Sequence, residues 1–218
     1  MIERTIAATT HGRYVVEAPS SGTPAGMLVG FHGYAEPAEA QLERMRGIDA
    51  VDRWLLVAVQ GLHRFYHRRA NQVVASWMTR QDRELAIADN IAYIGGVVDA
   101  VAREWPRSSA LVFAGFSQGV ATAFRAAAAS ARRVDGVIAV GGDVPPEIGA
   151  AALGGIGRVL VCRGSRDEWY TTAKFDADIG RLRAGGAAVT PLAFDGGHEW
   201  PGEVDAAAAA FLKNVLAR

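Results

Sequence analysis

The sequence predicts an α/β fold in which a mostly parallel central sheet carries helices on both faces. Short apolar runs of strand length alternate with longer segments whose apolar residues recur at helical spacing. Such alternation is typical of a parallel sheet covered on both sides. The chain has 218 residues, of which 50% are hydrophobic and 21% charged, enough for one domain with a large core. We therefore expect residues 1–218 to form a single domain.

The N-terminal part begins with an edge strand and continues through two buried strands separated by a helix. Pro37 suits the first turn of that helix, where a missing N–H group costs nothing. Ala38, Leu42 and Met45 then recur at helical spacing. The predicted elements are a strand at residues 13–18, a turn at 19–24, a strand at 26–31, a helix at 37–51 and a strand at 54–59.

The rest of the chain continues this alternation. Leu85, Ala88 and Ile91 share one side of a long amphipathic helix. The last helix is acidic at its start and basic at its end, as the helix dipole prefers. The predicted elements are a helix at residues 82–105, a strand at 110–114, a helix at 120–131, strands at 134–140 and 157–162, a helix at 172–184, a strand at 188–193 and a helix at 202–216.

Residues 60–81 form the exception, because they lack clear periodicity and are long for a loop in a compact domain. They follow a predicted strand, so they should overhang the carboxyl edge of the sheet, where ligands of such folds bind. Phe65, Tyr66 and Trp77 within this loop are candidates for an apolar substrate pocket. The alternative is that they only anchor the loop.

The pattern G-x-S-x-G occurs at residues 115–119, between a predicted strand and an alanine-rich helix. Strand, serine and helix in this order are the context in which the pattern indicates a nucleophile elbow. In such a tight turn, the residues two positions before and two positions after the serine have almost no room for a side chain. Gly115 and Gly119 meet this requirement. Ser117 is therefore the predicted nucleophile, at the start of a helix whose free N–H groups favour a developing oxyanion.

An acid and then a base should follow such a nucleophile along the chain. Asp167 lies just past the strand at 157–162, and His198 lies just past the last strand. The imidazole would take the proton of Ser117, and a buried carboxylate would orient the imidazole and stabilise the imidazolium ion. Asp143, which follows the preceding strand, is an alternative acid.

The oxyanion hole should combine the N–H of the residue after the nucleophile with an N–H from the loop after an earlier strand. Gln118 fills the first position. The loop at residues 32–35 offers the second, through the N–H of Tyr34, with Gly33 letting the backbone approach. We expect His32 to have a structural role.

Taken together, these segments resemble the α/β-hydrolases that lack a large cap domain, and most of all the phospholipase/carboxylesterase family that includes acyl-protein thioesterases. The resemblance covers nearly the whole chain and is carried by the segments at residues 31–33, 115–119, 164–167 and 197–198. It implies an α/β-hydrolase fold with Ser117, Asp167 and His198 as catalytic triad. It also implies Tyr34 and Gln118 as oxyanion donors.

The expected activity is two-step hydrolysis of a small-molecule carboxylic ester or thioester, through an acyl-enzyme on Ser117 and without a cofactor or metal. Two alternatives stay open. The same triad could cleave a peptide or a polyester, or the chain could be a non-catalytic module that binds a ligand or partner in its pocket.

Composition excludes several other classes. Basic and acidic residues balance at 23 each, so nothing points to nucleic acid or to a charged membrane surface. Cys162 is the single cysteine, which excludes an intrachain disulfide. His63 and His67 have no third partner, so no metal site is predicted. Without an apolar signal core or a run of about 18 apolar residues, we expect a cytoplasmic protein without stable membrane insertion. The oligomeric state stays open.

Overall fold

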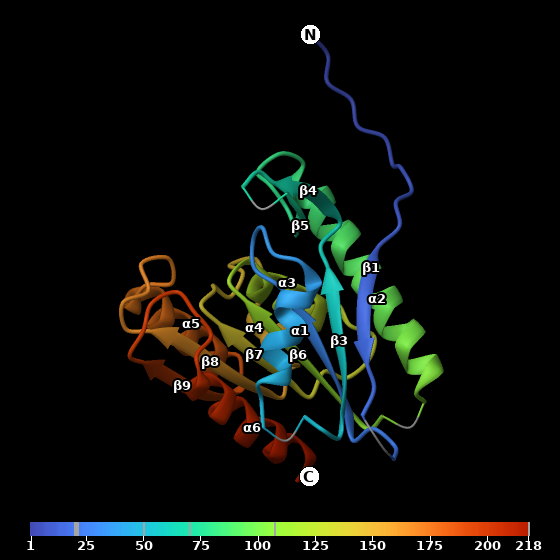
Figure 1. Cartoon of the computed structure of the whole chain (residues 1–218). Helices are drawn as coiled ribbons and strands as arrows, with labels where there is room; N and C mark the ends of the chain where they lie inside the picture. The colour runs from blue at the N-terminus through green and yellow to red at the C-terminus, as the bar shows by residue number, and fades with distance from the viewer. Residues whose placement is uncertain (20–21, 50, 70, 107, 218) are drawn as a thin grey trace.

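A seven-stranded sheet forms the centre of the molecule (Figure 1). The computed structural model describes residues 1–19, 22–49, 51–69, 71–106 and 108–217. In spatial order the strands are β1 (Arg13–Glu17), β3 (Trp54–Gln60), β2 (Gly26–Phe31), β6 (Ala110–Phe116), β7 (Gly136–Val140), β8 (Arg158–Gly164) and β9 (Ala188–Phe194). Only β1 in this sheet is antiparallel to its neighbour, so the predicted mostly parallel sheet is confirmed.

Helices cover both faces of the sheet, also as predicted (Figure 1). One face is covered by α1 (Ala38–Arg46) and α6 (Gly202–Leu216), and the other by α2 (Arg83–Glu104), α3 (Gln118–Ala129), α4 (Ala150–Gly154) and α5 (Thr172–Ala184). The central strands β2, β3, β6 and β7 are buried along their whole length, which explains their nearly continuous apolar sequences.

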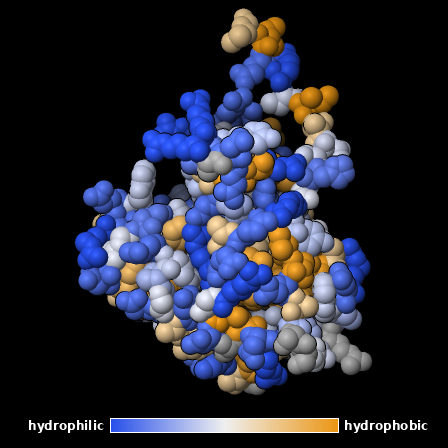
Figure 2. Space-filling view, in the orientation of Figure 1, coloured by the Kyte–Doolittle hydropathy of each residue, from blue (hydrophilic) through white to orange (hydrophobic). Residues whose placement is uncertain are grey.

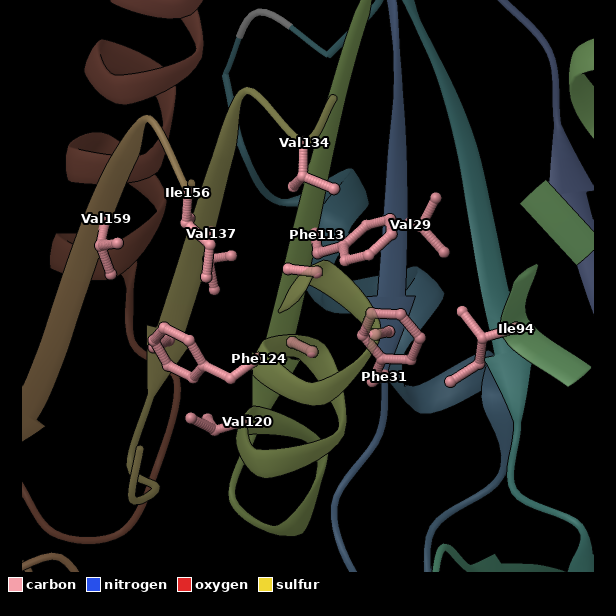
Figure 3. Close-up of a cluster of buried hydrophobic side chains, with 14 of the residues drawn as sticks. Val29, Phe31, Ile94, Phe113, Val120, Phe124, Val134, Val137, Ile156 and Val159 are labelled. Carbon is pink, nitrogen blue, oxygen red and sulfur yellow. The ribbon is translucent and has the colours of Figure 1, made fainter. Parts of the chain in front are cut away.

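The core on the α2–α3 face is built from side chains of adjacent strands and of the helix above them (Figure 3). Phe31 of β2 and Phe113 of β6 meet edge to face, with ring centroids 5.4 Å apart. Phe124 of α3 is fully buried in the same cluster. These contacts hold α3 against the sheet, and with it Gln118, the first residue of the helix.

Most predicted elements lie where the sequence placed them, with differences of one or two residues at several ends. The first helix ends at Arg46, followed by Gly47 at its C-cap, and does not continue to residue 51. The short helix α4 between β7 and β8 was not predicted, because five residues are too few for a periodic pattern to stand out. Part of the turn predicted at residues 19–24 lies outside the described residues.

The prediction of an irregular loop at residues 60–81 was wrong. This segment forms an antiparallel hairpin of β4 (His63–His67) and β5 (Gln72–Ser76), which stands at one end of the sheet (Figure 1). A bridge between Glu36 and Ala75 ties the hairpin to the loop after β2. β4 is largely exposed, whereas the end of β5 is buried, so neither strand shows the regular alternation of apolar and polar residues that a sequence pattern detects.

By length and composition alone α2 could cross a membrane, contrary to the expectation that no segment is apolar enough to do so. The helix at the core of a folded domain passes the same test. In this structure Ile94, Val98 and Val101 are buried against the sheet, whereas Asp89 and Asp99 lie on the exposed side. α2 therefore serves as a covering helix of the domain.

Apolar side chains also occur in the extended segment that precedes β1. Figure 2 shows them along the part of the chain that stands away from the body, where Met1, Ile2 and Ile6 are exposed.

Cys162 is fully buried in β8, and burial raises the pKa of its thiol. We expect this thiol to be chemically inert.

The contact between α3 and β2 generates a prediction about stability. A Cβ atom on Gly119 would lie 2.1 Å from the carbonyl oxygen of Phe31, so Gly119→Ala should lower the free energy of unfolding by about 1–3 kcal/mol. Gly180 in α5 has open space around it, and Gly180→Ala should raise stability by up to about 1 kcal/mol. Urea unfolding of both variants tests this, and equal effects would contradict it.

Candidate active site

The predicted nucleophile lies at a strained turn between β6 and α3. Ser117 has φ 52° and ψ −119°, a conformation that non-glycine residues rarely adopt. Its N–H group donates to the carbonyl oxygen of Val140 on the adjacent strand, at 2.9 Å. A Cβ atom on Gly115 would lie 2.5 Å from the carbonyl oxygen of Gly119, so both bracketing glycines are required by the closeness of strand and helix.

His198 and Asp167 lie in line with this serine. Nε2 of His198 is 2.8 Å from Oγ of Ser117, and Nδ1 of His198 is 2.8 Å from Oδ2 of Asp167. An ionised carboxylate only accepts hydrogen bonds, so Nδ1 carries the proton and donates a hydrogen bond to Asp167. Nε2 is then an acceptor, ready to receive the hydroxyl proton of Ser117.

Asp167 is held by its own loop. Its side chain is 1% exposed, and Oδ1 accepts the N–H groups of Trp169 and Tyr170, each at 2.9 Å. Asp143, the alternative acid, instead accepts a hydrogen bond from Lys174 at 3.2 Å, and its side chain is 53% exposed. The structure thus brings Asp167, and not Asp143, to the imidazole.

An ion pair supports both the imidazole and the loop after β2. Glu36 accepts two hydrogen bonds from Arg44, at 2.7 and 2.6 Å, and one from the N–H of Gly33 at 2.7 Å. The guanidinium of Arg44 lies 4.1 Å from the ring centroid of Phe116. Phe116 in turn packs against His198, with 5.1 Å between the ring centroids.

These contacts fix the backbone on either side of Tyr34. The N–H of Gly33 is bound by Glu36, and the N–H of Ala35 donates to the carbonyl oxygen of Ala75 at 3.0 Å. Tyr34 lines the same cavity as Ser117. The second predicted oxyanion donor, Gln118, is the first residue of α3, so its N–H group has no acceptor within the helix.

His32 takes the structural role that the sequence analysis expected. It is fully buried and accepts the N–H of Gly61 at Nε2, 3.0 Å away. Nδ1 must then carry the proton, which it donates to the carbonyl oxygen of Gly33 at 2.7 Å. Burial lowers the pKa of this imidazole, so the neutral form is favoured.

The side chain of Gln118 has a function that the sequence did not reveal. Its Oε1 accepts the N–H of Trp77 at 3.0 Å, and its Nε2 donates to the carbonyl oxygen of Met78 at 3.1 Å. The segment that follows the hairpin is therefore bound directly to the residue after Ser117.

The three aromatic residues predicted for the substrate pocket lie elsewhere. Trp77 is fully buried and donates from Nε1 to the carbonyl oxygen of His32 at 2.8 Å, so it belongs to the core beneath the loop. Phe65 packs against the ring of Tyr34, and Tyr66 is 69% exposed on the hairpin. None of the three is among the residues that line the cavity next to Ser117.

A cavity of about 640 Å³ opens beside Ser117 and His198. Its walls come from the loops after β2, β5, β7, β8 and β9, from the first turns of α2 and α5, and from one side of α3. They are formed by Tyr34, Met78, Arg83, Ser117, Gln118, Ala121, Arg125, Gly141, Gly142, Asp143, Pro145, Pro146, Trp169, Tyr170, Lys174 and His198. Arg125 was not predicted to belong to the site. Its position eight residues after Ser117, within a predicted helix, could have indicated that it lies on the same side of the helix as the serine.

His63 and His67 do not form a ligand pair. They lie at opposite ends of β4, which separates their Cα atoms by about 13 Å along the strand. Within the described part of the chain, no three His, Cys, Asp or Glu side chains gather closely enough to hold a metal ion.

Several solved structures share this fold. Esterase PE8 has a TM-score of 0.74 at 20% identity, and the match covers 94% of this chain and 100% of that one. Acyl-protein thioesterase 2 from Zea mays has a TM-score of 0.75 at 17% identity, covering 95% and 100%. A carboxylesterase from Mesorhizobium loti has 0.75 at 19%, covering 93% and 94%. At these identities the likeness shows the α/β-hydrolase fold alone.

No curated protein matches the sequence. A family model described as Phospholipase/Carboxylesterase does match residues 14–171, which is more than half of the chain. The matched region runs from β1 past Asp167 and includes Ser117, and it ends before His198. The chain therefore belongs to the phospholipase/carboxylesterase family of α/β-hydrolases.

Proposed function

We propose that this protein is a serine hydrolase that cleaves carboxylic esters or thioesters through an acyl-enzyme on Ser117. One observation carries the proposal: hydroxyl, imidazole and buried carboxylate follow one another at 2.8 Å and 2.8 Å in a single line. Nucleophile, base and orienting acid need this geometry. Membership of the phospholipase/carboxylesterase family supports an ester substrate.

In the first step, Oγ of Ser117 attacks the ester carbonyl carbon while Nε2 of His198 takes the hydroxyl proton. Asp167 stabilises the imidazolium ion that results. The N–H groups of Tyr34 and Gln118 bind the negative oxygen of the tetrahedral intermediate, and each such donor is worth about 2.7–4 kcal/mol in comparable enzymes. His198 then gives its proton to the departing alcohol or thiol, which leaves the acyl group on Ser117.

The second step repeats the first with water as the nucleophile. Nε2 of His198 takes a proton from water as the oxygen attacks the acyl carbon, and the same two N–H groups bind the oxyanion. The proton then returns to Oγ of Ser117 as the acid is released. The exposed rim of the cavity gives water access to this intermediate.

Ser117→Ala should abolish hydrolysis of a short p-nitrophenyl ester, because the acyl-enzyme can no longer form. Wild-type protein should also be labelled by a fluorophosphonate, and the variant should not. Release of p-nitrophenol and gel fluorescence measure the two effects. Full activity of the variant would reject the mechanism, and an inert Ser117 in the wild type would favour a ligand-binding module.

Asp167→Asn should lower kcat by about 10⁴-fold, because an amide stabilises the wrong imidazole tautomer. The matched change Asp143→Asn removes only a half-exposed ion pair with Lys174, so kcat should change much less. Steady-state kinetics on one activated ester compares the two variants directly. A larger loss for Asp143→Asn would reassign the acid.

Glu36 should act as a positioning residue for the oxyanion loop. Glu36→Ala leaves the N–H of Gly33 without its acceptor, so kcat should fall about tenfold or more while KM changes little. Glu36→Gln should restore part of the activity, since an amide oxygen still accepts that hydrogen bond. Glu39, which pairs with Arg13 at the surface, provides the control Glu39→Ala. Equal losses at both positions would contradict this role.

A further inference from the structure

One wall of the cavity holds a buried cation. Arg125 lines the cavity, yet its side chain is only 7% exposed. Lys174, the other basic side chain near Asp143 in the cavity lining, is 49% exposed and is paired with Asp143. Burying a guanidinium costs free energy unless its N–H donors are satisfied, so the surroundings of Arg125 indicate what this wall can bind.

Arg125 shares one side of α3 with the predicted nucleophile. Ala121 and Arg125 lie one turn apart on the same side of α3, Ser117 immediately precedes the helix, and all three line the cavity. The Cα atom of Arg125 is about 12 Å along the axis from that of Ser117, and its side chain tilts back toward the helix start. Ala121 is small and leaves the space between them open.

The hydrogen bonds of Arg125 leave part of its guanidinium available. Nε and Nη2 both contact a single oxygen, Oε1 of Glu147, at 2.7 and 2.6 Å. Nη1 contacts the thioether sulfur of Met78 at 4.0 Å. Sulfur is a weak acceptor, so the N–H groups of Nη1 would gain a much stronger bond from a carboxylate oxygen.

A second guanidinium reinforces the positive character of this wall. Arg83 lines the cavity and lies 3.8 Å from the same oxygen of Glu147. Neither Glu147 nor Glu84, the two carboxylates that pair with Arg83, is itself among the residues that line the cavity. Among the charged side chains that line the cavity, Arg83, Arg125 and Lys174 are cationic and Asp143 is anionic, so the lining carries more positive than negative charge.

We propose that this wall binds an anionic group of the substrate, so that the enzyme prefers esters with a carboxylate a few bonds from the reacting carbonyl. The inference rests on the proposed hydrolase function and names its substrate class. A guanidinium fork matches the planar carboxylate, and Ala121, Pro145 and Pro146 give the intervening methylene groups an apolar path. The competing interpretation is that Arg125 only ties α3 to Glu147.

Matched ester pairs test the proposal. In the first pair, monoethyl adipate carries a carboxylate on the acyl side and ethyl hexanoate lacks it. In the second pair, 4-acetoxybutanoate carries a carboxylate on the alcohol side and butyl acetate lacks it. Hydrolysis in a pH-stat gives kcat/KM for each ester. In at least one pair, wild-type protein should prefer the anionic member by about tenfold or more, and the pair that shows it identifies the side that faces Arg125.

Arg125→Gln should bring the ratio of kcat/KM between the anionic and the neutral ester close to one, and Arg83→Gln should reduce this ratio in part. Arg132→Gln removes the same charge from a surface pair with Asp99 and should leave the preference unchanged. Thermal unfolding checks that each variant is folded. If Arg125→Gln does not fold, Arg83→Gln decides the test.

A wild-type preference at or below one in both pairs, with neutral esters hydrolysed through Ser117, overturns the anion site and leaves the proposed function intact. An unchanged preference in folded Arg125→Gln also overturns it. If no ester is hydrolysed and Ser117 is inert, the proposed function fails separately. Calorimetry with adipate then decides: binding that Arg125→Gln abolishes supports the anion site, and absence of binding refutes it.

Discussion

The first turn of α3 lies almost in contact with the backbone at the end of β2, and the candidate site depends on this closeness. A hydrogen at residue 119 faces the carbonyl oxygen of Phe31, where any side chain would overlap it. Ser117 and the loop at residues 32–36 are thereby held in one geometry, although some eighty residues of chain separate them. The strained backbone of Ser117 persists because the surrounding packing determines it. Donors fixed in this way need little reorganisation when charge develops.

The sequence was sufficient for the parts of the site that depend on local geometry. The nucleophile elbow follows from two glycines, a serine and the elements on either side, all within one short segment. The choice between Asp143 and Asp167 could not be made in the same way, because each follows a strand at the carboxyl edge of the sheet. Strand pairing shows which of the two lies next to His198: β8 is adjacent to β9, so the loop that holds Asp167 is the neighbour of the loop that holds His198.

The walls of the cavity could not be predicted, because they combine segments from distant parts of the chain. Trp77 has the composition of a pocket residue, but its indole N–H finds a carbonyl acceptor in the core and the ring is buried there. The hairpin of β4 and β5 escaped detection because its two short strands form a sheet of their own and show no regular alternation of apolar and polar residues. Arg125 carried a signal in its spacing from Ser117. A charged residue on the outer side of a helix nevertheless has a solvated role in most proteins, and only the fold shows it to be enclosed.

The side chain of Gln118 connects the segment after the hairpin to the candidate site. Its amide group is hydrogen-bonded to the backbone at residues 77 and 78, while its own N–H is a proposed oxyanion donor. A tilt of the hairpin would therefore strain the residue that carries this proposed donor. A molecule that binds to the outside of the hairpin, without entering the cavity, would in this way act on the residue next to Ser117.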